Sequence, residues 1–122
     1  MAVVRYIVGD VDRAIAFYTE QLGFVLEQQM GPAFAIVTRE GLSIWLSGPR
    51  SSAARPMRDG RRPEPGGWNR VVIEVGDLES RVAELKEAGL GFRSDVVTGP
   101  GGKQIVLDDP DGNAIELFEA AR

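Results

Sequence analysis

The feature that most constrains the fold of this chain is an internal repeat, in which the first half recurs in the second. Three pairs of segments align in the same order: residues 4–11 (VRYIVGDV) with 71–78 (VVIEVGDL), Leu-Gly-Phe at 22–24 with 90–92, and residues 43–47 (SIWLS) with 114–118 (AIELF). One residue is inserted before the second Leu-Gly-Phe. Because strand-like, turn-like and helix-like segments recur together, we interpret the chain as two copies of one structural unit.

The first copy combines the signals of strands and of one helix. Residues 2–8 are rich in β-branched side chains and predict a strand, which Gly9 ends. Asp10 is typical of a helix N-cap, and apolar residues then follow helical spacing as far as Gly23, a typical C-terminal cap. Further strands are predicted at 24–30, 33–38 and 42–47, the last two joined by a tight turn at Glu40-Gly41.

The second copy predicts the same elements. A strand at 71–75 leads through Gly76-Asp77 into a helix at 78–90, and residues 99–103 predict a hairpin turn or a mobile lip. The apolar stripe of this helix is expected to consist of Leu78, Val82, Leu85 and Ala88. Each copy is therefore predicted to be a β-α-β-β-β module.

A long segment without periodicity joins the two copies. Residues 48–67 contain several Pro and Gly residues and five arginines against Asp59 and Glu64. Such a segment is either a solvated linker or a lid over a pocket, whose arginines would meet an anionic group or a partner subunit. We expect one domain over residues 1–122, with module one at 1–47 and module two at 68–122.

Composition excludes several kinds of chemistry. The chain has no cysteine and no histidine, which excludes disulfides, thiol catalysis, imidazole acid–base catalysis and metal sites built on those residues. A formal charge of −4 argues against a nucleic-acid partner. No apolar run is long enough to span a membrane, and no signal peptide is evident, so we expect a cytoplasmic protein.

The C-terminal stretch, residues 109–118 (DPDGNAIELF), combines a turn with a strand. Pro fixes φ, Gly accepts a positive φ, and Asp bonds to its own backbone, as tight turns require. The segment also begins like a Ca²⁺-binding loop, but Ala114 stands where that loop needs Gly and Ala120 where it needs Glu, so a turn is predicted. Glu116 then lies in the middle of a strand.

Each copy contains a strand, Gly-Asp, a helix and Leu-Gly-Phe, and the second copy closes with DPDGN-x-IEL. This combination resembles the vicinal oxygen chelate superfamily. That superfamily includes glyoxalase I, extradiol dioxygenases, fosfomycin-resistance enzymes and bleomycin-resistance proteins. The resemblance implies an α+β fold in which tandem βαβββ modules form a cupped mixed sheet with helices on the outer face. It also implies four metal-ligand positions, which here hold Val3, Trp45, Arg70 and Glu116.

Those four residues do not form a divalent metal site. Valine has no donor atom, indole has only an N–H donor, and guanidinium has no lone pair to offer. Only the Glu116 carboxylate could ligate a metal, and it lies opposite an arginine. We therefore predict neither a metal ion nor another cofactor. Only a site built from other oxygen ligands would change this expectation.

The same positions suit a small-molecule pocket. Strand parity places aromatic and sparse polar residues on the cupped face, as in typical ligand sites. The predicted ligand-binding residues are Arg5, Phe34, Trp45, Trp68, Arg70, Glu74 and Glu116. The alternative is a filled core, in which Trp45 packs and Arg70 forms an internal ion pair with Glu116.

Of three candidate functions, the first is the one that we predict, and the other two are alternatives. The first is metal-free binding and sequestration of an aromatic small molecule by a homodimer, for which bleomycin-resistance proteins are the nearest analogy. The second is a lyase, isomerase or dioxygenase of the glyoxalase type, with an unusual metal site or with Glu116 or Glu74 as a metal-free base. The third is a regulatory module that docks a partner through the arginine-rich segment.

Overall fold

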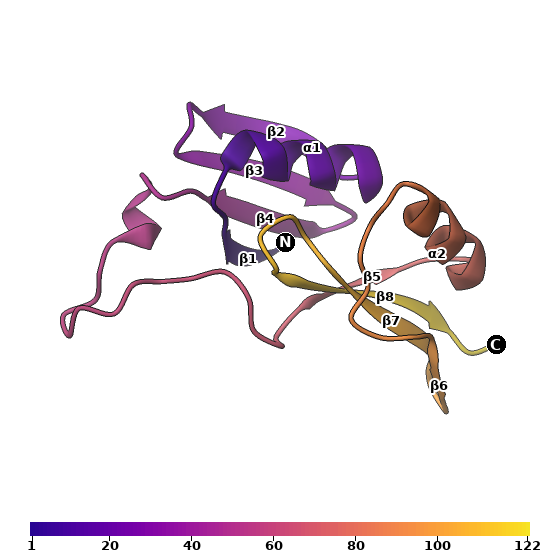
Figure 1. Cartoon of the computed structure of the whole chain (residues 1–122). Coiled ribbons are helices and arrows are strands. Elements are labelled where there is room, and N and C mark those ends of the chain that lie inside the picture. The colour runs from indigo at the N-terminus through magenta and orange to yellow at the C-terminus, as the bar shows by residue number, and fades with distance from the viewer. The chain divides into compact units, whose positions relative to one another are not determined.

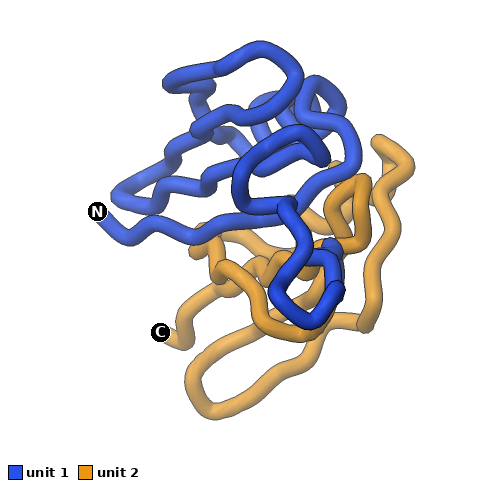
Figure 2. The backbone as a smooth tube through the Cα atoms, turned by 90° about the vertical axis from the view of Figure 1, so that its left-hand side faces the viewer, with its two compact units in different colours: residues 1–66 blue, residues 67–122 orange.

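The computed structural model describes residues 1–122, and the chain divides into two compact units at residues 66 and 67 (Figure 2). Each unit holds one copy of the sequence repeat, and each is described by itself. Unit 1 contains β1 (Ala2–Ile7), α1 (Val11–Gln21), β2 (Val25–Met30), β3 (Phe34–Arg39), β4 (Leu42–Ser47) and the short 3₁₀ helix η1 (Ser52–Ala54). Unit 2 contains β5 (Val71–Glu74), α2 (Leu78–Glu87), β6 (Val97–Gly99), β7 (Gly102–Asp108) and β8 (Ala114–Ala120) (Figure 1).

The two sheets have the same topology. Unit 1 has the strand order β1-β4-β3-β2, and unit 2 has the order β5-β8-β7-β6. In each sheet the first strand runs parallel to the last strand of its unit, while the other neighbours are antiparallel. The predicted α+β fold of tandem βαβββ modules is therefore confirmed.

One face of the unit 1 sheet packs against α1. Alternate residues of β3 and β4 are buried on this face, as period-two patterning requires, and they meet the apolar stripe of the helix. The fully buried residues are Ala14, Tyr18, Ala35, Val37, Ile44 and Leu46. The ring of Tyr18 also meets Phe24 edge-on, with 5.5 Å between their centroids. This packing leaves the other sheet face to carry the candidate site.

Unit 2 repeats this arrangement around α2. The buried strand residues Val71, Ile73, Ile105, Leu107, Ile115 and Leu117 lie on one sheet face, and Leu78, Val82 and Leu85 provide the helix side of the core. A turn at residues 100–101 joins β6 to β7, as predicted. No helix in the chain is long and apolar enough to cross a membrane.

Equivalent aspartates cap the two helices. The carboxylate of Asp10 accepts the backbone N–H of Arg13, and that of Asp77 accepts the backbone N–H of Ser80. Each bond satisfies one of the free N–H groups at a helix start. Gly23, with φ of +73°, ends α1 as expected.

Two expected boundaries are wrong. The second helix ends at Glu87 rather than at residue 90, because Ala88 is its C-cap and Gly89 follows with φ of +88°. Ala88 is consequently exposed and does not join the apolar stripe. The strand expected from residue 24 begins at Val25, since Phe24 turns inward against Tyr18.

The joining segment is partly structured within unit 1. It carries η1, and the Ser51 hydroxyl is buried and donates a 2.7 Å hydrogen bond to the carbonyl of Gly48. A side chain at Gly48 would meet Val11 Cγ2 at 2.8 Å. The start of this segment is therefore packed closely against α1 rather than free in solvent.

Candidate functional site

The open face of the unit 1 sheet holds the predicted aromatic residues. In the strand register Arg5 of β1 lies beside Trp45 of β4, and Ile36 of β3 lies on the other side of Trp45. Phe34 is placed beside Ser47 at the end of β4. This register confirms that Arg5, Phe34 and Trp45 share one face, and Glu40-Gly41 forms the expected tight turn with both residues at positive φ.

These side chains contact one another. The rings of Phe34 and Trp45 meet edge-on, with centroids 5.8 Å apart. The Arg5 guanidinium carbon lies 5.2 Å from the Trp45 ring centroid, and Arg5 Nη1 donates a 3.0 Å hydrogen bond to Ser47 Oγ. Both rings are half-buried and Arg5 is exposed. We name Arg5, Phe34 and Trp45 the aromatic cluster; it offers ring surface and a cation to the same side of the sheet.

In unit 2 the structure joins Arg70 to Glu116. Arg70 Nε and Nη2 lie 3.0 and 2.9 Å from the same carboxylate oxygen, Glu116 Oε1. The Glu116 side chain is only 10% exposed and that of Arg70 26%. Oε2 of Glu116 has no partner among the hydrogen bonds and ion pairs of the unit. The predicted ion pair is present, and it leaves one carboxylate oxygen available to a hydrogen-bond donor.

The remaining two predicted residues lie apart from this carboxylate. Glu74 is exposed at the end of β5 and stands beside Phe118, two positions along the sheet from Glu116. Trp68 is 70% exposed, and its backbone carbonyl accepts a 3.3 Å hydrogen bond from Arg70 Nη1. Trp68 is thus linked to the ion pair through Arg70, whereas Glu74 is not.

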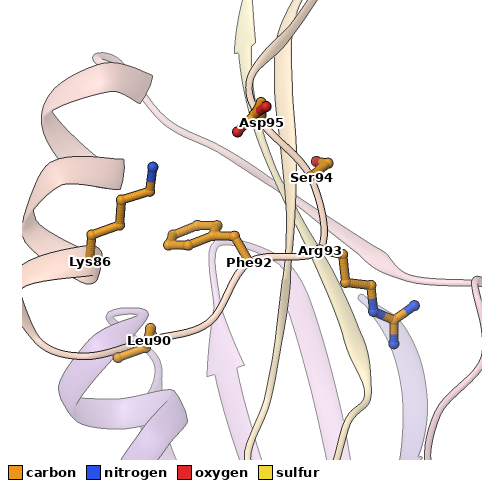
Figure 3. A pocket seen from close by; sticks show the side chains of 6 residues that line it. All are labelled: Lys86, Leu90, Phe92, Arg93, Ser94 and Asp95. Carbon is orange, nitrogen blue, oxygen red and sulfur yellow. The ribbon is translucent and has the colours of Figure 1, made fainter.

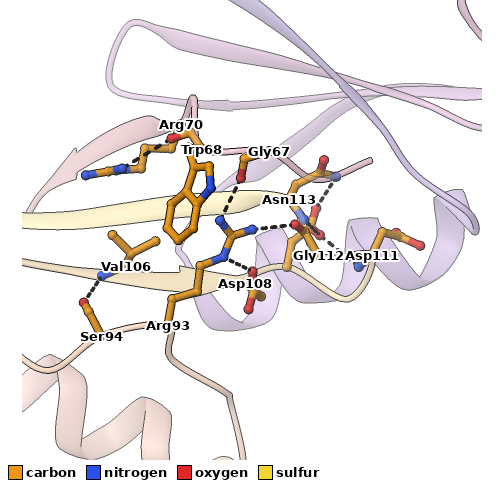
Figure 4. Close-up of polar contacts among 11 residues, drawn as sticks. Gly67, Trp68, Arg70, Arg93, Ser94, Val106, Asp108, Asp111, Gly112 and Asn113 are labelled. Atoms are coloured by element: carbon orange, nitrogen blue, oxygen red, sulfur yellow. Dashed lines mark hydrogen bonds and ion pairs between the residues drawn. The ribbon is translucent and has the colours of Figure 1, made fainter. Parts of the chain in front are cut away.

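All three side-chain nitrogens of Arg93 donate hydrogen bonds (Figure 4). The sequence patterns did not single out this residue. Nε donates to Asp108 Oδ1 at 2.7 Å, Nη1 to the Gly67 carbonyl at 2.7 Å, and Nη2 to the Gly112 carbonyl at 2.8 Å. Its guanidinium carbon lies 4.7 Å from the Trp68 ring centroid. The repeat contains a signal for this residue: Arg93 follows Leu-Gly-Phe where module one has Val25.

The turn at residues 109–113 is held by hydrogen bonds within the turn, as predicted. Asp109 Oδ1 accepts the backbone N–H groups of Asp111 and Asn113, and Oδ2 accepts the Asn113 side-chain amide. Gly112 adopts a φ of +85°. The turn's own donors therefore occupy the Asp109 carboxylate, and the turn presents the Gly112 carbonyl to Arg93.

A cavity of about 410 Å³ lies beside the end of α2 (Figure 3). Its lining residues are Lys86, Leu90, Phe92, Arg93, Ser94 and Asp95. The Lys86 ammonium lies 5.8 Å from the Phe92 ring centroid, while the Arg93 guanidinium points away from Phe92 toward its own partners. None of the residues predicted to bind a ligand lines this cavity.

The metal positions implied by the resemblance do not fit a metal ion. Val3 and Trp45 in unit 1 offer no atom that can ligate a metal ion, and in unit 2 the Arg70 guanidinium occupies Glu116 Oε1. A cation already bound to a carboxylate opposes the approach of a second one. These four residues therefore provide no site for a divalent metal ion.

Comparison with known proteins agrees with this fold. The sequence profile of the Glyoxalase/Bleomycin resistance protein/Dioxygenase superfamily matches residues 1–117. The uncharacterized protein YwkD of Bacillus subtilis (strain 168) is 30% identical, with 95% of this chain and 93% of YwkD covered.

Two solved structures are similar over almost the whole chain. A superfamily member from Sphaerobacter thermophilus is 30% identical, with a TM-score of 0.75 and coverage of 98% of this chain and 95% of that one. TnmS3, an antibiotic binding protein from Streptomyces sp. CB03234, is 26% identical, with a TM-score of 0.74 and coverage of 98% and 93%.

The duplicated β-α-β-β-β module, with polar and aromatic residues on the sheet face opposite each helix, defines a class of tandem-module α+β proteins. The chain belongs to the Glyoxalase/Bleomycin resistance protein/Dioxygenase superfamily.

Proposed function

We propose that this protein binds and sequesters a small aromatic molecule without a metal ion. The aromatic cluster of unit 1 is the observation that carries the proposal. It presents two half-buried rings at right angles and one exposed arginine on a single sheet face. Ring surface with a few polar groups is the usual lining of a small-molecule site.

The cluster is suited to a planar ligand because its rings are already ordered. Phe34 supports Trp45 edge-on, and Arg5 is held over Trp45 by its hydrogen bond to Ser47. Ordering a side chain on binding costs about 0.5–1.5 kcal/mol, and a preformed contact avoids that cost. A flat ring would therefore bind here with little rearrangement of the protein.

Glu116 of unit 2 offers a polar group on a separate surface. Arg70 fixes the orientation of the carboxylate through Oε1, so that Oε2 can accept a hydrogen bond from an N–H or O–H group. We propose that Glu116 accepts such a donor from a small molecule bound to unit 2.

The comparisons support binding of this type. TnmS3 is described as an antibiotic binding protein, and its identity of 26% extends over nearly the full chain. We extend the proposal to a planar aromatic antibiotic as ligand and, by analogy with the superfamily members that the sequence resembles, to a homodimer. Light scattering coupled to size exclusion tests the dimer, and a monomeric mass across the micromolar range contradicts it.

A thermal-shift screen tests the binding function. The panel contains planar aromatic drugs, glycopeptide antibiotics, glutathione adducts and the divalent ions Mg²⁺, Mn²⁺ and Ni²⁺. A ligand at 100 times its Kd adds about 2.7 kcal/mol of stability, which raises the Tm of a domain of this size by several degrees. We expect such a shift with aromatic compounds and none with the metal ions.

The matched variants are Trp45→Leu, which removes the ring from the cluster, and Phe92→Leu, which removes a ring of unit 2 outside the predicted site. Loss of the shift in Trp45→Leu locates the ligand on the aromatic cluster. A saturable shift with a divalent ion, reversed by chelator, would contradict the proposal. Retention of the full aromatic shift in Trp45→Leu would contradict the location.

A further inference from the structure

Trp68 is an exposed residue that is nevertheless held in place. Its side chain is 70% exposed, and it follows Gly66 and Gly67, whose φ values of +113° and +93° suit only glycine. An indole on an irregular segment of this kind normally exchanges between rotamers in solvent. Here the surrounding contacts restrict both its backbone and its ring.

Arg93 restricts the ring and the preceding peptide. The guanidinium lies 4.7 Å from the Trp68 ring centroid while it donates to the carbonyl of Gly67. Its own plane is fixed by two further bonds, to Asp108 and to the Gly112 carbonyl. With three nitrogens bonded to three separate points, the guanidinium has little freedom to rotate, and the ring that stacks on it is restrained in turn.

Arg70 restricts the following peptide. Its Nη1 donates to the Trp68 carbonyl, while its Nε and Nη2 hold Glu116 Oε1. In Figure 4 the indole lies between the two arginines, with Arg93 beneath the ring. Trp68 is therefore linked on both sides to groups that are themselves fixed, and one of these is the Arg70–Glu116 ion pair.

Charge indicates the kind of ligand that such a ring would accept. Arg93 is paired with Asp108 and Arg70 with Glu116, so the indole is surrounded by balanced charges rather than by an excess of either sign. A balanced environment gives no advantage to an ionic ligand, and an exposed ring favours a planar, uncharged partner.

We propose that Arg93 is a positioning residue that holds the Trp68 indole as a preformed stacking surface for a planar, uncharged aromatic ring. The inference goes beyond the proposed function, because it gives unit 2 a ligand surface of its own. The alternative is that Arg93 only fastens residues 67–68 to the rest of unit 2 and that no ligand meets Trp68.

The first test uses no ligand. In a Trp45→Phe background Trp68 is the only tryptophan, so its fluorescence anisotropy and its quenching by acrylamide report on this ring alone. Arg93→Lys keeps the charge but loses the planar stack and the bonds to both carbonyls. We expect lower anisotropy and stronger quenching than in Arg81→Lys, a control that alters an arginine of α2 paired with Glu84.

Unchanged anisotropy and quenching in a folded Arg93→Lys protein would overturn the positioning role. If Arg93→Lys does not fold, Asp108→Asn replaces it, since this variant keeps the guanidinium and removes only its ionic partner. The same direction of change is expected there, and no change would count equally against the inference.

The second test titrates the planar aromatic compounds of the panel into the Trp45→Phe protein. At least one uncharged compound should quench Trp68 fluorescence saturably, and Trp68→Ala should weaken its binding, measured by calorimetry, at least about fivefold, the factor for roughly 1 kcal/mol of aromatic stacking. Arg93→Lys should weaken binding in the same direction, with no comparable loss in Arg81→Lys.

The outcomes separate the two proposals. If no planar aromatic compound quenches Trp68, or if quenching compounds bind Trp68→Ala as tightly as the wild type, the stacking surface is overturned and the proposed function is untouched. If no compound gives a thermal shift that depends on Trp45, the proposed function is overturned and the stacking surface is judged by Trp68 quenching alone.

Discussion

Trp45 and Glu116 occupy the same position in the two copies of the repeat, yet they have opposite chemistry. Each lies on the last strand of its module and each contacts an arginine from the first strand or the residue before it: Arg5 over the Trp45 ring, and Arg70 on the Glu116 carboxylate. The strand position is therefore the same in both copies, whereas its side chain and the arginine that contacts it differ, since Arg5 aligns with Val72 and Arg70 with Val3.

At the residue scale, the contributions of Arg70 and Glu116 to the free energy of unfolding should be strongly coupled. Glu116→Leu leaves the Arg70 guanidinium without its carboxylate, and we expect it to destabilise the fold by about 1–3 kcal/mol. This is below the 3–5 kcal/mol for fully buried pairs, because Arg70 is 26% exposed. Urea unfolding of Glu116→Leu, Arg70→Met and the double variant measures the coupling.

In this cycle the double variant should be more stable than the sum of the two single losses predicts. Replacing both members of a buried pair with apolar residues is often neutral. Strictly additive losses would mean that the two side chains stabilise the fold independently of each other.

Asp77 should make helix α2 sensitive to acid. The hydrogen bond from the Ser80 backbone N–H, followed by the one from its hydroxyl, lowers the pKa of Asp77 from the usual 3.8. A lowered folded-state pKa contributes stability that is present above 3.8 and is lost as the pH falls through the folded value. Compared with Asp77→Asn, the wild-type protein should therefore lose more stability between pH 6 and pH 2.5.

Urea unfolding at the two pH values measures this difference. Asp10→Asn at the equivalent cap of α1 provides the matched comparison within the same fold. If the stability gap between wild type and Asp77→Asn is the same at pH 6 and pH 2.5, the capping carboxylate has no role in the acid response.

At the scale of elements, the β6–β7 hairpin depends on one glycine. Gly102 has a φ of +144°, and a Cβ there would collide with the Glu119 carbonyl oxygen of β8. Gly102→Ala must move β7 away from β8 and should destabilise unit 2 by about 2–4 kcal/mol.

Gly101→Ala is the control, because a Cβ at Gly101 meets nothing within 4 Å. Thermal unfolding of the two variants compares them directly. Equal Tm values for both would show that β7 and β8 tolerate the displacement and that their close pairing is not required.

The repeat made the elements predictable from sequence. Strand, cap and helix signals in one copy supported those in the other, and strand parity placed Arg5, Phe34 and Trp45 on one face. The end of α2 was not predicted correctly, since Leu90 continues an apolar pattern that Gly89 interrupts with a positive φ.

The contacts of Arg93 could not be derived in the same way. They join residues 67, 93, 108 and 112, which no periodic pattern connects, and their geometry depends on the path of two loops. The sequence signal, an arginine where module one has Val25, marks the position as unusual but does not name its partners. Long-range side-chain contacts of this kind are seen only in the folded unit.

At the scale of the whole molecule, each unit builds its own core and its own functional surface. Unit 1 provides the aromatic cluster, while unit 2 provides the Arg70–Glu116 pair and the indole of Trp68. The proposed ligand contacts the aromatic cluster, so its binding should stabilise unit 1 directly. At saturation it should slow hydrogen exchange in β1, β3 and β4, which exchange resolved along the chain would measure.

The measurement that tests the central claim most directly is an NMR titration that follows the two indole N–H resonances. The chain has only two tryptophans, so Trp45→Phe assigns both signals at once. The account predicts that a planar aromatic antibiotic shifts the Trp45 resonance saturably and that Mg²⁺ leaves it unmoved. If no aromatic compound moves the Trp45 resonance, or if Mg²⁺ shifts it saturably, the proposal of a metal-free aromatic-binding site is wrong.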